Sequence, residues 1–256
     1  MNLNLFNKTF LISGSSKGIG LKIAESLLSE NANVIITGRS KNLIKNQFNK
    51  LYSKFGLKVA YVDGDIKSNL VLKKITSLIK KRWKKLDGIV VNAGSIKMNI
   101  SSFSSEKDFY WYQKNNFLNA FKFVNHFLNE IKKSQGSIVF ISSIASLKDL
   151  GAPLGYASSK LFLNFYSKFL ANKLAEYNVR VNNILPGNIY LEGGNWDKKI
   201  KKNPKKVKKM IENQVPLKRF GKPEEIANLA TFLLSSKSGF MTGAEIVIDG
   251  GQIIKR

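Results

Sequence analysis

Short runs of apolar and β-branched residues recur along the chain, and segments with apolar residues spaced three and four apart lie between them. The runs are continuous and do not alternate in polarity, which is typical of parallel strands covered by helices on both faces. We therefore predict seven strands, at residues 9–13, 33–37, 58–62, 88–92, 137–141, 179–185 and 245–248.

The segments between the runs show helical stripes. One stripe consists of Ile19, Ile23, Ala24, Leu27 and Leu28, and another of Val71, Ile75, Leu78, Ile79 and Leu86. A later helix should begin at Pro223, because proline fits the first helical position and acidic residues follow it. Since strands and helices alternate, we predict an α/β fold, a doubly wound seven-stranded parallel sheet of the Rossmann type, with ligands at the carboxyl ends of its strands.

Length and composition fit one large domain spanning 1–256. The chain has 256 residues, of which 43% are hydrophobic and 23% charged, and no segment approaches the roughly 20 apolar residues that cross a bilayer. The first residues carry no leader pattern and run directly into the first strand, so we expect no membrane partner and a cytoplasmic location. With no cysteine and a single histidine, His126, we also expect no metal site.

The formal net charge of +25 has two interpretations. The excess is mostly lysine, scattered along the chain together with much asparagine and isoleucine, which favours compositional drift over selection for an anionic partner. No zinc-finger spacing, RNA-binding aromatic set or basic heptad pattern supports a nucleic-acid partner. We therefore expect none, although binding to a polyanion would also explain the charge.

One composition shift lies at residues 197–209, which read DKKIKKNPKKVKK. It falls within a predicted substrate loop at about 188–215. The segment is either a solvated lysine face or a mobile lid over the substrate pocket whose positive field favours anionic substrates.

A glycine-rich turn follows the first predicted strand and opens a helix. Glycines at 14, 18 and 20 have no Cβ, so the backbone can turn tightly and approach a pyrophosphate, to which the helix N-terminus offers free N–H groups. We predict that this loop binds a dinucleotide through Gly14, Ser16, Lys17, Gly18, Ile19 and Gly20. The alternative is a helix-start turn without a ligand.

The end of the second strand indicates which dinucleotide. It reads Thr37-Gly38-Arg39-Ser40, where NAD-selective folds place a carboxylate for the ribose 2′-hydroxyl. The guanidinium of Arg39 would pair instead with a 2′-phosphate, and Lys17 adds charge. We predict a preference for NADP(H), with NAD(H) as the alternative cofactor; Arg39 could also be an ordinary exposed arginine.

Tyr156 and Lys160 stand four residues apart, so on a helix both project from one face. An ammonium beside a phenol favours the phenolate, and acid/base work near neutral pH requires the pKa of about 10 to fall by roughly three units. Together with Ser143, thirteen residues upstream, the pair predicts a proton-transfer site.

At this point the chain resembles the short-chain dehydrogenase/reductase family, in particular its 3-oxoacyl-[acyl-carrier-protein] reductases, over essentially its whole length. The matching motifs occur in family order: Gly14 to Gly20, Asp65-Ile66, Asn92-Ala93-Gly94, Asn116, Ser143 with Tyr156 and Lys160, Pro186-Gly187, Thr242-Gly243 and Asp249-Gly250-Gly251.

The resemblance implies roles for these residues. Tyr156 would be the general acid/base, Ser143 would hydrogen-bond the substrate oxygen, and Lys160 would lower the pKa of Tyr156 and hold the nicotinamide ribose. Asn116 would anchor a water that links Lys160 to solvent, although Asn115 and Asn119 are close by. The remaining cofactor contacts would come from Asp65, Ile66, Asn92, Ala93, Gly94, Pro186, Gly187 and Ile189.

Some of these motifs have simpler interpretations or depart from the family pattern. Asp65 could cap the following helix, and residues 92–94 could be only a turn. Val91 replaces a second asparagine, which we expect to change a hydrogen bond at a sheet edge. Leu191 stands where the family often has a threonine that touches the nicotinamide carboxamide, so backbone groups near Ile189 would make that contact.

The function expected from this resemblance is an NADP(H)-dependent oxidoreductase that transfers hydride between nicotinamide and a ketone or secondary alcohol. The substrate would be a 3-oxoacyl thioester or a sugar derivative, with anionic compounds among the candidates. The alternative is a catalytically silent nucleotide-sensing module of the same fold. Two helices carry more large apolar residues than one buried stripe requires, so some of them should meet another subunit: Phe109, Trp111, Phe117, Phe121, Phe123, Leu161, Phe162, Phe165, Phe169 and Leu170. The resemblance implies that these helices form the contacts of a homotetramer or homodimer.

Overall fold

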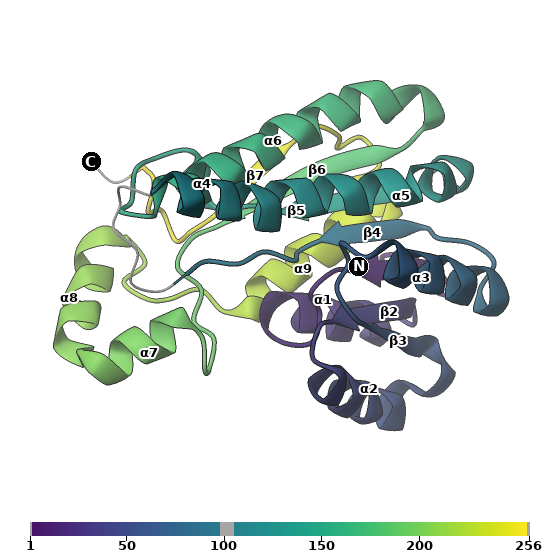
Figure 1. The fold of residues 1–256 in the computed structure, drawn as a ribbon, viewed down its shortest axis with the longest axis horizontal. Helices are drawn as coiled ribbons and strands as arrows, with labels where there is room; N and C mark the ends of the chain where they lie inside the picture. The colour runs from purple at the N-terminus through teal and green to yellow at the C-terminus, as the bar shows by residue number, and fades with distance from the viewer. Residues whose placement is uncertain (1, 98–104, 255–256) are drawn as a thin grey trace.

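A seven-stranded parallel sheet forms the centre of the molecule. The computed structural model describes residues 2–97 and 105–254. The strand order is β3-β2-β1-β4-β5-β6-β7, and every neighbouring pair is parallel (Figure 1). The strands are β1 (Thr9–Ile12), β2 (Asn33–Gly38), β3 (Val59–Asp63), β4 (Gly88–Val91), β5 (Ser137–Ile141), β6 (Arg180–Pro186) and β7 (Glu245–Ile248). The predicted fold class is confirmed, and each predicted strand lies within a residue or two of an observed one.

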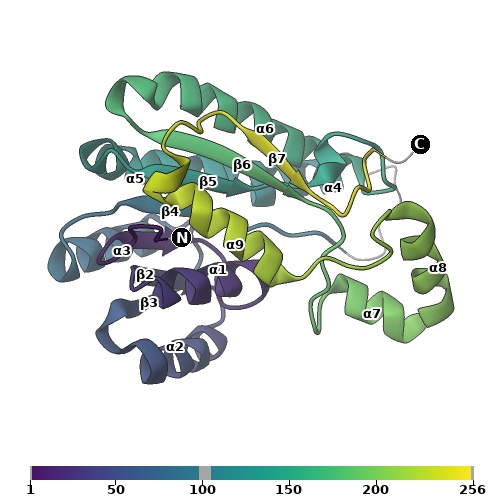
Figure 2. The same ribbon diagram turned by 180° about the vertical axis from the view of Figure 1, so that it is seen from behind.

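Helices cover both faces of the sheet (Figures 1 and 2). One face carries α3 (Asn69–Arg82), α5 (Asn119–Ser134) and α6 (Leu154–Leu174), and the other carries α1 (Gly18–Ser29), α2 (Lys41–Phe55) and α9 (Pro223–Leu234). Consecutive strand residues serve the two faces in turn: Leu11 packs with the first group of helices, whereas Phe10 and Ile12 pack with the second. This double burial explains the continuous apolar runs.

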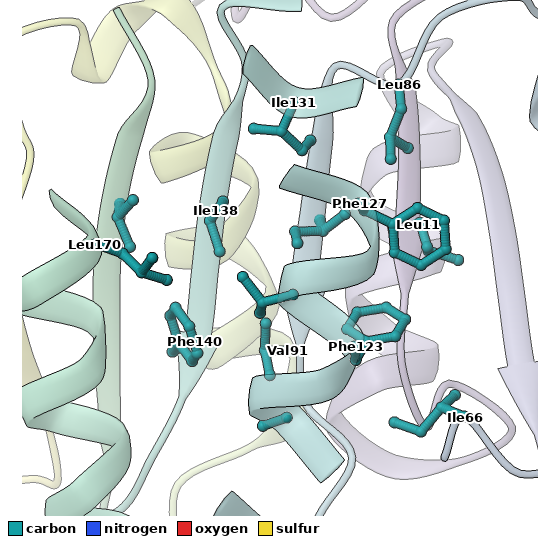
Figure 3. Packing of buried hydrophobic residues seen from close by; sticks show 14 of the residues in the cluster. Leu11, Ile66, Leu86, Val91, Phe123, Phe127, Ile131, Ile138, Phe140 and Leu170 are labelled. Atoms are coloured by element: carbon teal, nitrogen blue, oxygen red, sulfur yellow. The ribbon is translucent and has the colours of Figure 1, made fainter. Parts of the chain in front are cut away.

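The core under α5 is closely filled (Figure 3). Phe123 and Phe127 of α5 are fully buried in the cluster that contains Leu11 and Val91. Val91 lies in the central strand β4, opposite Phe140 of β5. Because β4 is not an edge strand, the sheet-edge location expected for Val91 is wrong, and its side chain supplies core packing. The altered hydrogen bond stays a prediction.

Helix α3 is shorter than its apolar stripe predicts. It ends at Arg82, and Lys84 adopts a left-handed conformation (φ 63°) that turns the chain toward β4. Leu86 therefore reaches the same core cluster from the connecting turn and not from the helix.

Two further groups of helices lie near the carboxyl ends of the strands. Helix α4 (Glu106–Tyr112) continues through a π-helical segment, Gln113–Leu118, into α5. Helices α7 (Asn195–Lys202) and α8 (Pro204–Gln214) occupy much of the predicted substrate loop and project beyond the carboxyl end of the sheet (Figures 1 and 2). Short 3-10 turns occur at Gly56–Lys58, Ile144–Ser146, Ala175–Tyr177 and Ser236–Ser238. Within the described ranges, no helix has the length and apolarity to cross a bilayer.

The strand order changes direction between β1 and β4, which are neighbours in the sheet: β2 and β3 lie on one side of β1, and β4 to β7 lie on the other. Because the strands are parallel, the turns after β1, β2, β4, β5 and β6 all leave from one edge. This edge is where doubly wound folds bind their ligands.

Candidate active site

The turn from β1 into α1 is packed too closely for side chains. A Cβ on Gly14, whose φ is +65°, would lie 3.0 Å from Cα of Ala93, and one on Gly20 would lie 2.6 Å from Nδ2 of Asn92. Helix α1 begins at Gly18, and its N-cap residue, Lys17, makes no side-chain capping hydrogen bond. The first-turn N–H groups are thus left for an anion, which fits the pyrophosphate of a dinucleotide.

Asn92 braces this turn from the end of β4. Its Nδ2 donates to the carbonyl oxygens of Ser13 (3.1 Å) and Gly14 (2.9 Å), and its backbone N–H donates to Oγ of Ser13. The backbone N–H of Ala93 donates to the same hydroxyl at 3.0 Å. Residues 92–93 are therefore more than a turn at a strand end, because they fix the shape of the glycine loop.

Two cations lie at the end of β2. Ser16 packs on Gly38, where an added Cβ would lie 2.9 Å from Cβ of Ser16. Lys17, which follows Ser16, and Arg39, which follows Gly38, are both exposed. The guanidinium of Arg39 forms no ion pair with any residue of the described ranges, so it is available to a 2′-phosphate.

Asp65 and Ile66 follow β3 at the same edge of the sheet. Ile66 is 8% exposed, and the carboxylate of Asp65 accepts from the backbone N–H of Lys67 and pairs with its ammonium at 3.2 Å. The N-cap of α3 is Ser68. The helix-cap interpretation of Asp65 is therefore wrong, because the residue shapes the turn before the helix.

Ser143, Tyr156 and Lys160 converge from β5 and α6. Ser143 follows β5 and precedes the 3-10 turn Ile144–Ser146, whose Ala145 N–H it accepts at 3.2 Å. Tyr156 lies in the first turn of α6, and the Ser143 side chain is near enough to its hydroxyl to lower the pKa of the phenol. Lys160, one turn later, is only 5% exposed. The predicted trio is therefore brought together at the carboxyl edge.

The electrostatic balance at Tyr156 differs from the expectation. Burial raises the pKa of Tyr156 above its ordinary value, and the Ser143 side chain offsets part of this effect. The ammonium of Lys160 lies 5.9 Å from the centre of the Tyr156 ring and donates to the carbonyl oxygen of Ile141 at 3.0 Å. Burial lowers the pKa of Lys160 to about 8. The expected depression of the Tyr156 pKa is wrong for this structure, because desolvation of the buried phenol is the largest effect and Tyr112 adds to it.

Asn116 lies in the π-helical segment and is fully buried. Its Oδ1 accepts from the backbone N–H of Ser95 (2.6 Å), and its Nδ2 donates to the carbonyl of Ser95 (3.1 Å). An added Cβ on Gly94 would lie 3.1 Å from Asn116 Oδ1 and 3.4 Å from Lys160 Nζ. The side chain of Asn115 instead returns to its own helix, at the carbonyl of Trp111. The structure thus selects Asn116 as the asparagine beside Lys160.

The segment after β6 reaches over the glycine loop. Gly187 has no room for a Cβ, which would lie 2.6 Å from Cβ of Asp249, and Ile189 is buried and bridges to Gly221. A Cβ on Gly18 would lie 3.2 Å from a methyl carbon of Leu191. Leu191 therefore covers the cofactor turn with an apolar contact at the position where the family pattern has a hydroxyl.

The comparison with known proteins decides the family. Residues 14–252 match a family whose description is Enoyl-(Acyl carrier protein) reductase. The chain is 32% identical over 252 residues to the 3-oxoacyl-[acyl-carrier-protein] reductase FabG of Aquifex aeolicus, covering 98% of this chain and 99% of that protein. The chain belongs to the short-chain dehydrogenase/reductase family. It is 30% identical to glucose 1-dehydrogenase 2 of Bacillus subtilis, covering 99% of this chain and 98% of that enzyme.

Solved structures agree with this membership. The L-sorbose reductase of Gluconobacter frateurii, solved with NADPH and L-sorbose, has a TM-score of 0.91 at 26% identity, with complete coverage of both chains. As a short-chain dehydrogenase/reductase, the protein is an oxidoreductase that acts on alcohol and carbonyl groups.

The site of this short-chain dehydrogenase/reductase includes Tyr112, which our sequence reasoning missed. The ring of Tyr112 packs edge-on against Tyr156, with centroids 6.1 Å apart, and its hydroxyl accepts from the backbone N–H of Lys97 at 3.2 Å. An added Cβ on Gly155 would lie 2.8 Å from the Tyr112 ring. Our sequence reasoning considered neighbouring aromatic residues of this helix for subunit contact and did not name Tyr112. No pattern along the chain signals its contact with Tyr156, because the two residues lie on different helices.

Proposed function

We propose that the protein is an NADP(H)-dependent reductase of ketones, with Tyr156 as the general acid. The observation that carries the proposal is the meeting of Tyr156, Ser143 and buried Lys160 at the sheet edge that also holds the glycine loop. The nicotinamide, when bound, supplies the hydride. The residues of the chain orient the carbonyl and deliver the proton.

The raised pKa of Tyr156 suits proton donation. Near neutral pH its hydroxyl is protonated, so it can give a proton to the substrate oxygen while Ser143 donates a hydrogen bond to the same atom. The opposite direction, alcohol oxidation, needs the phenolate and is therefore favoured at alkaline pH. Lys160 places a positive charge under the site, and Asn116 holds the Ser95 backbone beside it.

Preference for NADP(H) rests on Arg39 and Lys17. Both side chains are exposed. Arg39 follows β2, where a carboxylate would otherwise recognise the 2′-hydroxyl of NAD(H), and Lys17 lies in the glycine turn, next to Ser16, which packs on Gly38. The NADPH bound to L-sorbose reductase, a structural neighbour, supports this assignment. NAD(H) remains the weaker cofactor in the proposal.

The names of the relatives support two substrate classes. The 3-oxoacyl thioesters are named for FabG relatives, and sugars for glucose 1-dehydrogenase 2 and for the L-xylulose reductase of Caenorhabditis elegans, which is 30% identical. The exposed lysines of α7 and α8 favour an anionic member of either class. Both classes present a carbonyl to the same three side chains.

A substrate screen tests the proposal. NADPH oxidation would be followed with 3-oxoacyl thioesters, keto-sugars, simple ketones and an enoyl thioester, in wild type and in Tyr156→Phe. Reduction of a ketone that is lost in Tyr156→Phe supports the proposal. Reduction of the enoyl thioester alone, or ketone reduction that Tyr156→Phe retains, would refute the ketone mechanism, and no turnover with NADPH bound would favour a nucleotide-sensing module.

We also propose a homotetramer or homodimer, built on the outer faces of α5 and α6. Phe165 is 71% exposed and Phe169 49%, whereas Phe123 and Leu170, also predicted for subunit contact, are buried in the core. Several large apolar side chains exposed on one face are typical of an interaction surface. Light scattering should give a multiple of the chain mass that falls in Phe165→Glu and not in Leu57→Glu, a control at another exposed apolar residue.

A further inference from the structure

A group of buried polar side chains lies behind the active site, between β5, α6 and β6. Asn164 is 2% exposed and Asn183 is 0% exposed. The Oδ1 of Asn164 accepts from Oγ of Ser142 at 2.6 Å and from Nδ2 of Asn183 at 2.9 Å. The Nδ2 of Asn164 donates to Oγ of Ser146 at 2.8 Å. Asn164 is thus the centre of this group and uses both of its polar atoms.

The group is joined to the proposed catalytic residues. The hydroxyl of Ser146 donates to the carbonyl oxygen of Ser143 at 2.6 Å, and Oγ of Ser142 lies 3.2 Å from the carbonyl oxygen of Lys160. Asn164 is also one turn beyond Lys160 on α6, so the two residues share the helix face that begins with Tyr156. The connection from Asn164 to Ser143 therefore runs through a single hydroxyl, that of Ser146.

Burying these groups has a cost. Oδ1 of Asn183 finds no hydrogen-bond partner among the described residues, and an unpaired buried acceptor costs about 1–3 kcal/mol. An apolar pair at positions 164 and 183 would fill the same space without that cost. The retained polarity is explained if it serves the geometry of the site.

We infer that Asn164 is a positioning residue for Ser143, acting through Ser146. By holding the Ser146 hydroxyl, Asn164 fixes the Ser143 carbonyl and hence the direction of the Ser143 side chain toward Tyr156 and the substrate oxygen. This inference rests on the proposed function for its effect on turnover. Its effect on the local backbone is independent of turnover.

A matched control exists on the neighbouring residue of β6. Asn182 is also 0% exposed, but its amide pairs with the carbonyl of Met241 and the N–H of Ala244, away from Ser143. The variants are Asn164→Leu, Ser146→Ala and the control Asn182→Leu. Ser146→Ala removes the link to Ser143 with a smaller loss of packing, so it serves if Asn164→Leu does not fold.

Kinetics give the first readout. In Asn164→Leu and Ser146→Ala, kcat should fall about tenfold while the KM for NADPH changes less than about twofold, because small misplacement of a reacting group slows chemistry more than binding. The control should lose stability to urea and keep kcat within about twofold.

The pH midpoint of alcohol oxidation should rise in the two test variants, since Ser143 opposes the raised pKa of Tyr156. The other titratable groups facing Tyr156, Tyr112 and Lys160, are unchanged.

Amide hydrogen exchange gives a second readout that needs no substrate. Exchange in a peptide covering residues 142–147 should accelerate in the two test variants and not in the control. Unchanged kcat, pH midpoint and exchange in both test variants would overturn the inference and leave Asn164 as a packing residue. An inactive wild type would instead refute the proposed function, and the exchange data would still decide whether Asn164 holds the Ser143 turn.

Discussion

The polar residues of the active site and those of the α7–α8 hairpin (residues 195–214) are held in opposite ways. Asn116, Lys160 and Asn164 are at most 5% exposed, and each makes hydrogen bonds at defined atoms. The hairpin carries eight exposed lysines, of which two, Lys201 and Lys208, form ion pairs within the described ranges. The fold therefore fixes the geometry of the proposed proton-transfer site, whereas the hairpin presents mainly exposed positive charge.

The hairpin is nevertheless anchored at one point. The carboxylate of Asp197 is 5% exposed and accepts from the Tyr190 hydroxyl (3.0 Å), the Gly193 N–H (3.0 Å) and the Lys201 ammonium (2.8 Å). The hydrogen bond from Lys201 is the largest cause that lowers the pKa of this carboxyl. The lysines thus extend from a fixed base beside the segment that covers the glycine loop.

The largest expected effect is at Tyr156. Tyr156→Phe should lower the rate of carbonyl reduction by about 10³-fold, because the ring remains and only the proton donor is lost. Binding of NADPH, followed by fluorescence, should stay within about twofold. Retained turnover would show that another group delivers the proton. The buried residues around Tyr156 would then have no part in proton transfer.

Lys160 provides a test through stability. Its pKa falls from 10.5 in the unfolded chain to about 8 in the folded protein, so the buried charge destabilises the fold below pH 8. Between these values the folded protein has lost a proton that the unfolded chain keeps, so stability rises with pH. Between about pH 8 and pH 10.5, the unfolding free energy of wild type should therefore rise by about 3 kcal/mol relative to that of Lys160→Met. Parallel urea titrations at several pH values measure the difference, and a constant gap would contradict the burial of a charged amine.

Arg39 distinguishes the two cofactors. Arg39→Asp should weaken NADPH binding by about 2 kcal/mol, or roughly thirtyfold, through loss of a charge-assisted contact to the 2′-phosphate. NADH binding should change little. Equal losses for both cofactors in titration calorimetry would refute the assignment of Arg39.

The smallest effect is expected on the hairpin. Replacing Lys198, Lys202 and Lys205 with glutamine should raise the KM of an anionic substrate about threefold at low salt and leave stability within about 0.5 kcal/mol. A neutral ketone should be unaffected. The same change at Lys45, Lys50 and Lys54 of α2 is a charge-matched control on exposed residues of another helix. If both triple variants behave alike, the lysines are compositional and have no role in substrate attraction.

The parts of this molecule that could be predicted from sequence are those with a local signal. Continuous apolar runs marked the strands, because both faces of the sheet are covered, and glycines 14, 18 and 20 marked the cofactor turn. Tyr156 and Lys160 were found from a spacing of four, which places them on one helix face. In each case the physical cause lies within a few residues of the signal.

Contacts between distant segments could not be predicted in this way. Tyr112 reaches Tyr156 from another helix, and Asn164 reaches Ser143 through Ser146, so neither has a pattern along the chain. The pKa of Tyr156 was assigned the wrong direction, because the sequence shows the neighbouring amine but not the desolvation of the phenol. The interpretation of Asp65 as a helix cap was wrong for a similar reason, because the sequence does not show that Ser68 is the N-cap of α3.

In the π-helical segment Gln113–Leu118, the position of Asn116 depends on the number of residues in the helix. A π turn contains one residue more than an α turn, and here that extra residue brings Asn116 to Ser95 and Gly94. Deleting Lys114 would restore ordinary α-helical spacing and turn Asn116 by about 100° around the helix axis, away from Lys160. A chimeric enzyme with a crossover in this helix would therefore have to keep the number of residues in the π-helical segment, even if every side chain of the site were preserved.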